Sequence, residues 1–145
     1  MLSRDFEEFV ELLNSNKVEY LVVGAYALAV HGRPRYTGDF DLWIRPKRDN
    51  IEHVLLALNE VGFASVGLTV EDFLVPQAVM QLGYPPGRID LLTAIDGAEF
   101  EPCYRRRIDV EIAGLNLPVI GLDDFKTNKR ATGRLKDLAD LEALE

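Results

Sequence analysis

The chain has 145 residues, of which 48% are hydrophobic, so we expect one globular domain covering residues 1–145 and not a disordered chain. Its net charge of −8 argues against a protein that grips a long nucleic-acid backbone by neutralising phosphates. No apolar run reaches the roughly 18–20 residues that cross a bilayer, and the acidic N-terminus is unlike a signal peptide. The single cysteine, Cys103, permits no internal disulfide, and we therefore expect a cytoplasmic protein without a membrane partner.

Patterns in the first half of the chain predict alternating helices and strands. An amphipathic helix capped at Ser3 comes first, and "VEYLVVG" (18–24) is then a short apolar strand. "AYALAVHG" (25–32) reads as a short helix that ends at Gly32, and "DFDLWIRP" (39–46) alternates as a strand. The stretch "KRDNIEHVLLALNEVG" (47–62) predicts a second amphipathic helix, capped by Asp49 or Asn50.

The second half predicts further strands and two closing helices. Within 63–86, "FASVGLTVEDF" allows a short strand or a helical turn, and "AVMQLGYPPG" predicts a strand followed by a tight turn. "RIDLLTAI" (88–95) and "RRRIDVEIAG" (105–114) are strands, and Pro118 makes "LNLPVI" (115–120) an edge strand. Two helices parted near Thr132–Gly133 end the chain, so the predicted fold class is α/β (α+β).

An Asp-x-Asp pair lies inside the strand at 39–46. Alternation puts Asp39 and Asp41 on one face, about 6 to 7 Å apart at their Cα atoms, with Phe40 on the opposite, apolar face. Two carboxylates at this distance repel each other, and a hard divalent cation such as Mg²⁺ removes that penalty. The spacing alone does not decide, because Asp109 and Glu111 have the same spacing and equally apolar neighbours.

The segment before this pair favours the metal interpretation. "LVVGA" ends a strand at Gly24 and passes at once into a helix, where backbone N–H groups and a missing side chain allow a phosphate to approach closely. A phosphate-binding turn upstream of a metal-binding pair is the arrangement needed to hold a Mg²⁺–nucleoside triphosphate.

These residues resemble the nucleotidyltransferase superfamily typified by DNA polymerase beta and kanamycin nucleotidyltransferase. Val23, Gly24 and Ala25, followed by thirteen residues and "DFDL", match its spacing at the upper limit. The longer string "VVGAYALAVHGRPRYTGDFDLWI" is similar to small bacterial nucleotidyltransferases of the abortive-infection and toxin–antitoxin type. The resemblance implies a mixed β-sheet flanked by helices, with C-terminal helices, that transfers a nucleoside monophosphate from an NTP to a hydroxyl with two Mg²⁺ ions. The acceptor would be a protein, a tRNA end or a small molecule, and a toxin or antitoxin would be a protein partner.

The resemblance also implies the site residues. A third metal carboxylate is expected on an adjacent strand, where the tripeptide "RID" offers Asp90 or Asp109, and the apolar run around Asp90 favours the first. The catalytic and metal-binding set is therefore Asp39, Asp41 and Asp90, and the nucleotide-binding set is Gly24, Ala25, Arg35, Thr37 and Lys129. Ala25 departs from the family's Gly or Ser and offers no hydroxyl, which bears on activity more than on fold. Lys136, Asp137 and Asp140 match the family's last motif or form an ordinary amphipathic helix.

Two other functions compete with the enzyme hypothesis. A binding module of the same fold, acting through a protein partner, agrees with the small size and with Ala25. An aspartyl-phosphate phosphatase fits poorly, because "DFDLW" lacks the downstream Thr of those enzymes. His31 and His53 have no zinc or triad pattern, so we interpret both as structural.

Overall fold

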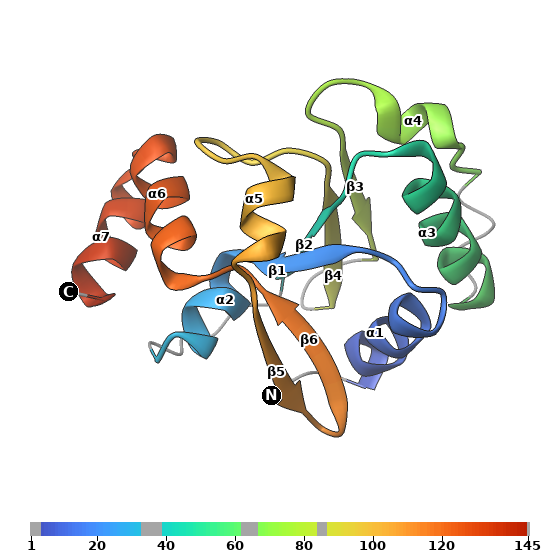
Figure 1. Ribbon diagram of the computed structural model, residues 1–145, viewed down its shortest axis with the longest axis horizontal. Helices are drawn as coiled ribbons and strands as arrows, with labels where there is room; N and C mark the ends of the chain where they lie inside the picture. Colours follow the sequence, from blue (N-terminus) through green and yellow to red (C-terminus); the bar gives the residue numbers. More distant parts are fainter. Residues whose placement is uncertain (1–3, 33–38, 62–66, 84–86, 145) are drawn as a thin grey trace.

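The computed structural model describes residues 4–32, 39–61, 67–83 and 87–144. Its centre is a six-stranded mixed sheet with the strand order β3-β4-β2-β1-β6-β5 (Figure 1). The strands are β1 (Tyr20–Val23), β2 (Asp39–Ile44), β3 (Val79–Leu82), β4 (Arg88–Leu92), β5 (Ile108–Ile112) and β6 (Leu115–Val119). The predicted mixed sheet flanked by helices is confirmed.

Helices surround this sheet. They are α1 (Arg4–Ser15), α2 (Gly24–Val30), α3 (Arg48–Val61), α4 (Val70–Leu74), α5 (Phe100–Arg105), α6 (Leu122–Thr132) and α7 (Leu135–Leu144). Within the described ranges, no helix combines the length and the apolar character that a membrane crossing requires. The last two helices form a hairpin at one end of the molecule, beside α2, whereas α3 and α4 lie at the other end (Figure 1).

The two faces of β2 pack against different helices. Phe40 is fully buried and stacks on Phe6 of α1, with ring centroids 4.9 Å apart. On the opposite face, Trp43 meets Phe100 of α5 edge to face at 5.2 Å. Trp43 therefore packs between the sheet and α5. The carboxylates Asp39 and Asp41 share the Trp43 face, further along the strand.

The strand at 115–120 is not an edge strand, which corrects the prediction drawn from Pro118. β6 lies between β1 and β5, and the edges of the sheet are β3 and β5. Pairing with β1 begins only at Val119, where Val119 lies opposite Val22 and the Ile120 amide donates to the Val22 carbonyl at 3.1 Å. Pro118 precedes that segment, so its missing N–H breaks no hydrogen bond to β1.

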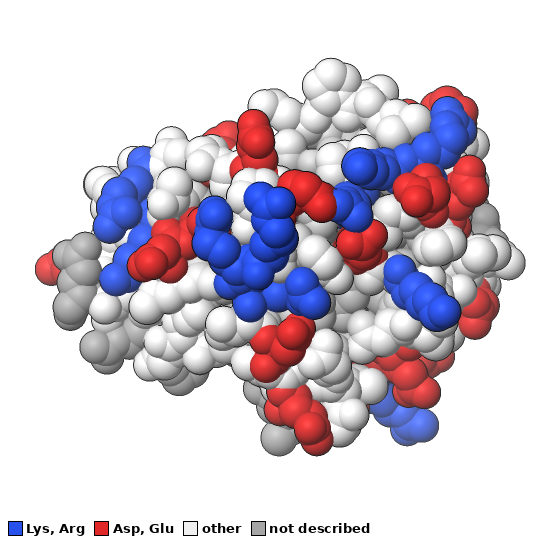
Figure 2. Space-filling view, in the orientation of Figure 1, with Lys and Arg blue, Asp and Glu red and all other residues white. Residues whose placement is uncertain are grey.

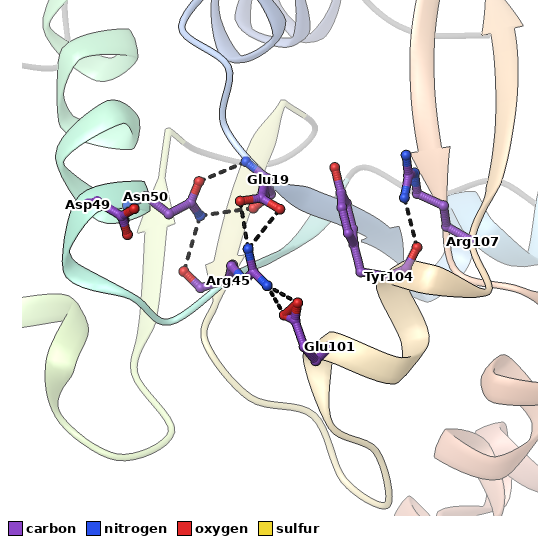
Figure 3. Close-up of polar contacts among 7 residues, drawn as sticks. All are labelled: Glu19, Arg45, Asp49, Asn50, Glu101, Tyr104 and Arg107. Atoms are coloured by element: carbon purple, nitrogen blue, oxygen red, sulfur yellow. Dashed lines mark hydrogen bonds and ion pairs between the residues drawn. The ribbon is translucent and has the colours of Figure 1, made fainter.

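Polar contacts join the start of α3 to the sheet (Figure 3). The buried Asn50 amide accepts a hydrogen bond from the Glu19 N–H at 2.7 Å and donates to the carbonyls of Glu19 and Arg45 at 2.9 and 3.1 Å. The Arg45 guanidinium in turn contacts Glu19 at 2.7 Å and also binds Glu101 of α5. Strands β1 and β2 and helices α3 and α5 are thereby held together.

Other local predictions have mixed outcomes. Asp49 and Asn50 do not cap their helix, because α3 already begins at Arg48 and the Asn50 side chain binds the β1–β2 backbone instead. The helical alternative for 63–73 holds at α4, and β3 confirms the strand predicted after it. Gly133, in the left-handed region at φ 64°, separates α6 from α7 as predicted. The predicted caps Ser3 and Gly62 lie outside the described residues.

Candidate functional site

Two neighbouring strands bring the three predicted carboxylates onto one face of the sheet. β2 and β4 are parallel, with Asp41 opposite Asp90 and Asp39 opposite Arg88. Side chains two positions apart on a strand point the same way, so all four side chains share one face. Asp109 and Glu111, the competing pair, lie exposed on the edge strand β5. The structure thus joins Asp90, and not Asp109, to the Asp-x-Asp pair.

Gly24 lies directly against this cluster. β1 is antiparallel to β2 with Val23 opposite Asp41, and the chain turns at Gly24 into α2. Gly24 has φ +68°, and a Cβ added to it would come within 2.3 Å of Asp41 Oδ2. Both the backbone conformation and the space therefore require glycine at this position. Ala25 follows at the same turn and lines the cleft described below.

Asp41 is electrostatically perturbed. Burial of its carboxyl, the charge of Asp90, a hydrogen bond to Asp90 and the charge of Asp39 together raise the pKa of Asp41 to about 6. Lys129 acts in the opposite direction. A carboxyl with this environment retains a proton more readily than an exposed one, because burial and like charges both disfavour its ionised form.

Arg88 lies within hydrogen-bonding distance of two of these carboxylates. Its Nη2 donates to Asp39 Oδ2 at 2.8 Å, and its Nε lies 3.0 Å from Asp90 Oδ1. The hydrogen bond to Asp90 and the charges of the three carboxylates raise the pKa of Arg88, against the effect of burial. The sequence analysis did not single out Arg88, although the same alternation that pairs Asp39 with Asp41 would have put Arg88 beside Asp90.

A cleft of about 310 Å³ extends from this cluster to the C-terminal helix hairpin. One side is formed by the ends of β1, β2 and β4, and the other by α6 and α7. The residues that line the cleft are Val23, Gly24, Ala25, Asp39, Asp41, Leu92, Ala94, Ile95, Asp96, Asn128, Lys129, Thr132, Arg134, Lys136 and Asp140. Five of the eight predicted site residues are therefore in the cleft lining, and Asp90 adjoins it through Asp41.

Lys129 is held in place by carboxylates of α7. Its Nζ lies 3.1 Å from Asp137 Oδ1 and 3.5 Å from Asp140 Oδ2, and all three side chains are buried. Arg134 completes the group, with its Nε 2.7 Å from Asp137 Oδ2. Burial would raise the pKa of Asp137, but hydrogen bonds from Arg134, Thr132 and Lys129 hold it well below its usual range. Lys136 is exposed, and it also lines the cleft.

Sequence reasoning missed some of the residues in this cleft. Arg134, Asp96 and Asn128 were not among the predicted site residues. Asn128 Nδ2 donates to the Asp96 carbonyl at 2.9 Å, which ties α6 to the segment after β4. Neither residue has a motif of its own, because each reaches the cleft through packing between distant parts of the chain. Arg35 and Thr37 lie outside the described residues.

The donor chemistry of the cluster fits a hard divalent cation. Carboxylate oxygens are the ligands that Mg²⁺ prefers, and Asp90 Oδ1 is buried and makes no hydrogen bond within the described part of the chain. Over the same described residues, no three His, Cys, Asp or Glu side chains are already spaced around a common centre as a complete ligand set. Asp39, Asp41 and Asp90 are thus suitable donors that share the space between them with Arg88.

Basic side chains also gather outside the cleft. Figure 2 shows a group of Lys and Arg side chains over α5, the region where the stretch Arg105–Arg107 ends that helix. Arg106 pairs with Asp124 at 2.8 Å, and Arg107 pairs with Asp109 at 3.3 Å. The charge of this cluster is thus largely compensated by local acids. His31 has a structural contact, with Nε2 2.8 Å from the Ile120 carbonyl.

Several solved structures of other proteins share this architecture. No family model matches the sequence, and no curated protein matches it. Among solved structures, a candidate nucleotidyltransferase from Thermotoga maritima aligns with a TM-score of 0.58 at 17% identity, covering 97% of this chain and 88% of that one. The lincosamide antibiotic adenylyltransferase LnuA, solved with lincomycin bound, aligns with a TM-score of 0.63 at 15% identity over 99% and 96% of the two chains.

The chain has the nucleotidyltransferase fold. An antigenic nucleotidyltransferase-like protein from Paracoccidioides brasiliensis also aligns, with a TM-score of 0.54 at 17% identity over 97% of this chain and 74% of that one. These alignments run over nearly the whole chain, so they include both the strands that carry the carboxylates and the α6–α7 hairpin. The nucleotidyltransferase fold is what the sequence resemblance predicted from Gly24 to Asp41.

Proposed function

We propose that this protein is a Mg²⁺-dependent nucleotidyltransferase that transfers a nucleoside monophosphate from a nucleoside triphosphate to an acceptor hydroxyl. The observation that carries this proposal is the pairing of Asp41 with Asp90, beside Asp39 and against Gly24, at the edge of a cleft. A cluster of like charges is costly for the fold, and a cation-dependent reaction gives it a chemical purpose.

In this proposal the three aspartates are the metal ligands. Asp39, Asp41 and Asp90 would hold the Mg²⁺ ions, of which the resemblance implies two. The ions would offset phosphate charge and increase the acidity of the acceptor hydroxyl. In the reaction a bond forms between the acceptor oxygen and the α-phosphorus, and the bond from that phosphorus to pyrophosphate breaks. The hydroxyl proton passes to a carboxylate of the Asp41–Asp90 pair.

The opposite side of the cleft would bind the triphosphate. Lys129 is buried close enough to Asp41 to influence its ionisation, so its charge is well situated to meet phosphate oxygens. Gly24 and Ala25 would contribute backbone N–H groups, since Ala25 has no hydroxyl. Arg35 and Thr37 stay predicted triphosphate contacts on the strength of the sequence resemblance. Such charge complementarity orients a substrate before reaction.

The proposal has three forms, which differ in the molecule that accepts the nucleotide. A protein side chain or a tRNA end is the acceptor expected from toxin–antitoxin relatives, in which case a toxin or antitoxin partner would accompany the enzyme. A small-molecule acceptor is the third form, because LnuA is an adenylyltransferase of similar extent that was solved with lincomycin bound. Transfer of a labelled nucleotide in lysate, with separate protein, RNA and small-molecule fractions, would distinguish the three.

The first test is calorimetric titration of the four NTPs, with Mg²⁺, into wild type and into the Asp39→Asn/Asp41→Asn double variant. The expected result is saturable binding by wild type that the double variant loses. A matched control is Asp109→Asn/Glu111→Gln, which removes two carboxylates of equal spacing on the exposed strand β5 and should bind as wild type does. A folded wild type that binds no NTP would refute the proposal and favour the binding-module alternative.

A further inference from the structure

Arg88 stands among the carboxylates that the proposed function assigns to the metal. Its guanidinium reaches Asp39 on β2 through Nη2 at 2.8 Å and Asp90 on its own strand through Nε at 3.0 Å. Register puts Arg88 directly opposite Asp39, so the strand pairing itself delivers the positive charge to this position. Asp39, Asp41 and Asp90 all stabilise the charged guanidinium.

Two other cations of the described cleft, Lys129 and Arg134, bind carboxylates of α7. Lys129 lies close enough to Asp41 to lower its pKa, but its Nζ is bound by Asp137 and Asp140 of α7. Arg134 is likewise bound to Asp137. Among the described residues, Arg88 is therefore the cation that makes direct ion pairs with Asp39 and Asp90.

The contact between Arg88 and Asp90 is incomplete. Arg88 Nη2 donates to Asp90 Oδ2 at 3.2 Å, whereas Arg88 Nε and Asp90 Oδ1 are both buried and lie 3.0 Å apart without a hydrogen bond within the described ranges, so only one arm of this pair is aligned. The Arg88 side chain is 27% exposed, compared with 17% for Arg45 between its two glutamates. An ion pair that is partly exposed to solvent contributes only modest net stability, so a stronger competitor can displace it at small cost.

We infer that Arg88 is an internal counter-ion that neutralises the aspartate cluster in the absence of metal and competes with a divalent cation for Asp39 and Asp90. This inference rests on the proposed function, because it takes the three aspartates as the metal donors. The divalent cation carries twice the charge of the guanidinium and binds carboxylate oxygens at shorter distances, so it displaces the arginine from at least one partner.

Competition has a consequence that other roles for Arg88 lack. Removal of a purely structural ion pair lowers stability and leaves cation affinity unchanged or weaker. Removal of a residue that only contacts the triphosphate weakens nucleotide binding and leaves the affinity for the cation alone unchanged. Removal of a competing counter-ion lowers the stability of the metal-free protein and strengthens cation binding, and this opposite movement identifies the role.

The test compares wild type with Arg88→Met by calorimetric titration of Mg²⁺ and Mn²⁺ in the absence of nucleotide. Thermal denaturation in a chelator and with each cation accompanies the titration. Arg88→Met should have the lower melting temperature in chelator, and should bind the cation about two- to fivefold more tightly, the effect of removing one partly exposed ion pair. Arg88→Lys keeps a charge without the fork geometry, so its cation affinity should fall between the two.

The sequence provides a matched control. Arg107 precedes Asp109 in a second "RID" tripeptide, and its Nε lies 3.3 Å from Asp109 Oδ1 on the exposed edge strand. Arg107→Met removes an equivalent local pair far from the aspartate cluster along the sheet, and should leave cation affinity unchanged. A gain in affinity that appears in both Arg88→Met and Arg107→Met would overturn the inference, since it would reflect net charge only.

The remaining outcomes separate this inference from the proposed function. If wild type binds cation and Arg88→Met binds it equally or less tightly, Arg88 is not a competitor, and the metal site stands without it. If Arg88→Met binds cation more tightly while neither protein transfers a nucleotide from any NTP, the counter-ion role holds and the proposed reaction fails. Folded wild type and folded Arg88→Met that both ignore Mg²⁺ and Mn²⁺ would overturn both. If Arg88→Met folds only with cation present, that rescue supports the counter-ion role.

Discussion

Gly24→Ala offers a sharp test of the site geometry, because two physical costs meet at this residue and can be separated. The left-handed backbone, at φ +68°, costs an alanine about 1–2 kcal/mol. The added Cβ would also come within 2.3 Å of Asp41 Oδ2, so the Asp41 carboxylate or the turn must move. Overpacking of this kind costs about 1–3 kcal/mol more, which gives a total loss of about 2–5 kcal/mol in unfolding free energy.

Gly114→Ala supplies the control for the backbone cost. Gly114 has φ +78°, and an added Cβ would meet nothing within 4 Å. Gly114→Ala should therefore lose only about 1–2 kcal/mol in unfolding free energy, and the variant should bind Mg²⁺–NTP as wild type does. Urea unfolding gives the two stabilities, and calorimetric titration gives the two affinities. The reasoning is refuted if Gly24→Ala loses no more stability than Gly114→Ala and retains wild-type nucleotide binding, because Asp41 would then not be held against Gly24.

Three further predictions concern the hairpin side of the cleft. Lys129→Met removes one of the cations that bind the buried Asp137 and Asp140 and should cost about 2–4 kcal/mol in urea unfolding, whereas Arg130→Met at an exposed position of the same helix should stay within about 0.5 kcal/mol. The pKa of Asp137 is lowered in the folded protein, so its carboxylate stabilises the fold fully above pH about 4 and progressively less as pH falls further. Urea unfolding across that pH range should therefore show a difference in unfolding free energy between wild type and Asp137→Asn that shrinks below pH about 4. Gly97→Ala would put a Cβ 2.6 Å from that of Ala131 on α6, so thermal denaturation should show a loss and Mg²⁺–NTP titration a weaker affinity.

Local periodicity predicted the parts of the fold whose two faces differ. The sequence of β2 alternates clearly because Phe40 and Leu42 are fully buried while Asp39 and Asp41 are half-buried at the cleft. The end of a helix could also be predicted where the backbone requires glycine, as at Gly133. The sequence did not predict the position of a strand within the sheet, as β6 shows. Its neighbour β1 is distant in the sequence, and Pro118 is harmless because the pairing with β1 starts one residue later.

The candidate site divides in the same way. Asp39, Asp41 and Asp90 could be predicted from the sequence because strand alternation and motif spacing are both visible within short segments. The register of β2 with β4 then brings the three residues together. The second side of the cleft depends on how α6 and α7 pack, which no short pattern encodes. Lys129 was named from the resemblance, while its fixation by Asp137 and Asp140 became visible only in the folded chain.

Charge at this site is arranged so that the fold tolerates carboxylates without fully neutralising them. The pKa of Asp41 is raised to about 6 because burial and its acidic neighbours outweigh the influence of Lys129. Lys129 would offset more of that negative potential if α7 did not supply Asp137 and Asp140, which hold it at the far side of the cleft. Arg88 offsets a further part through contacts that are partly exposed, one of which, between Nε and Asp90 Oδ1, is not a hydrogen bond. A cluster balanced by tight internal ion pairs would have little affinity left for a cation. The proposed metal binding is compatible with this cluster because, among the described residues, Lys129 is fixed at a distance and Arg88 is partly exposed.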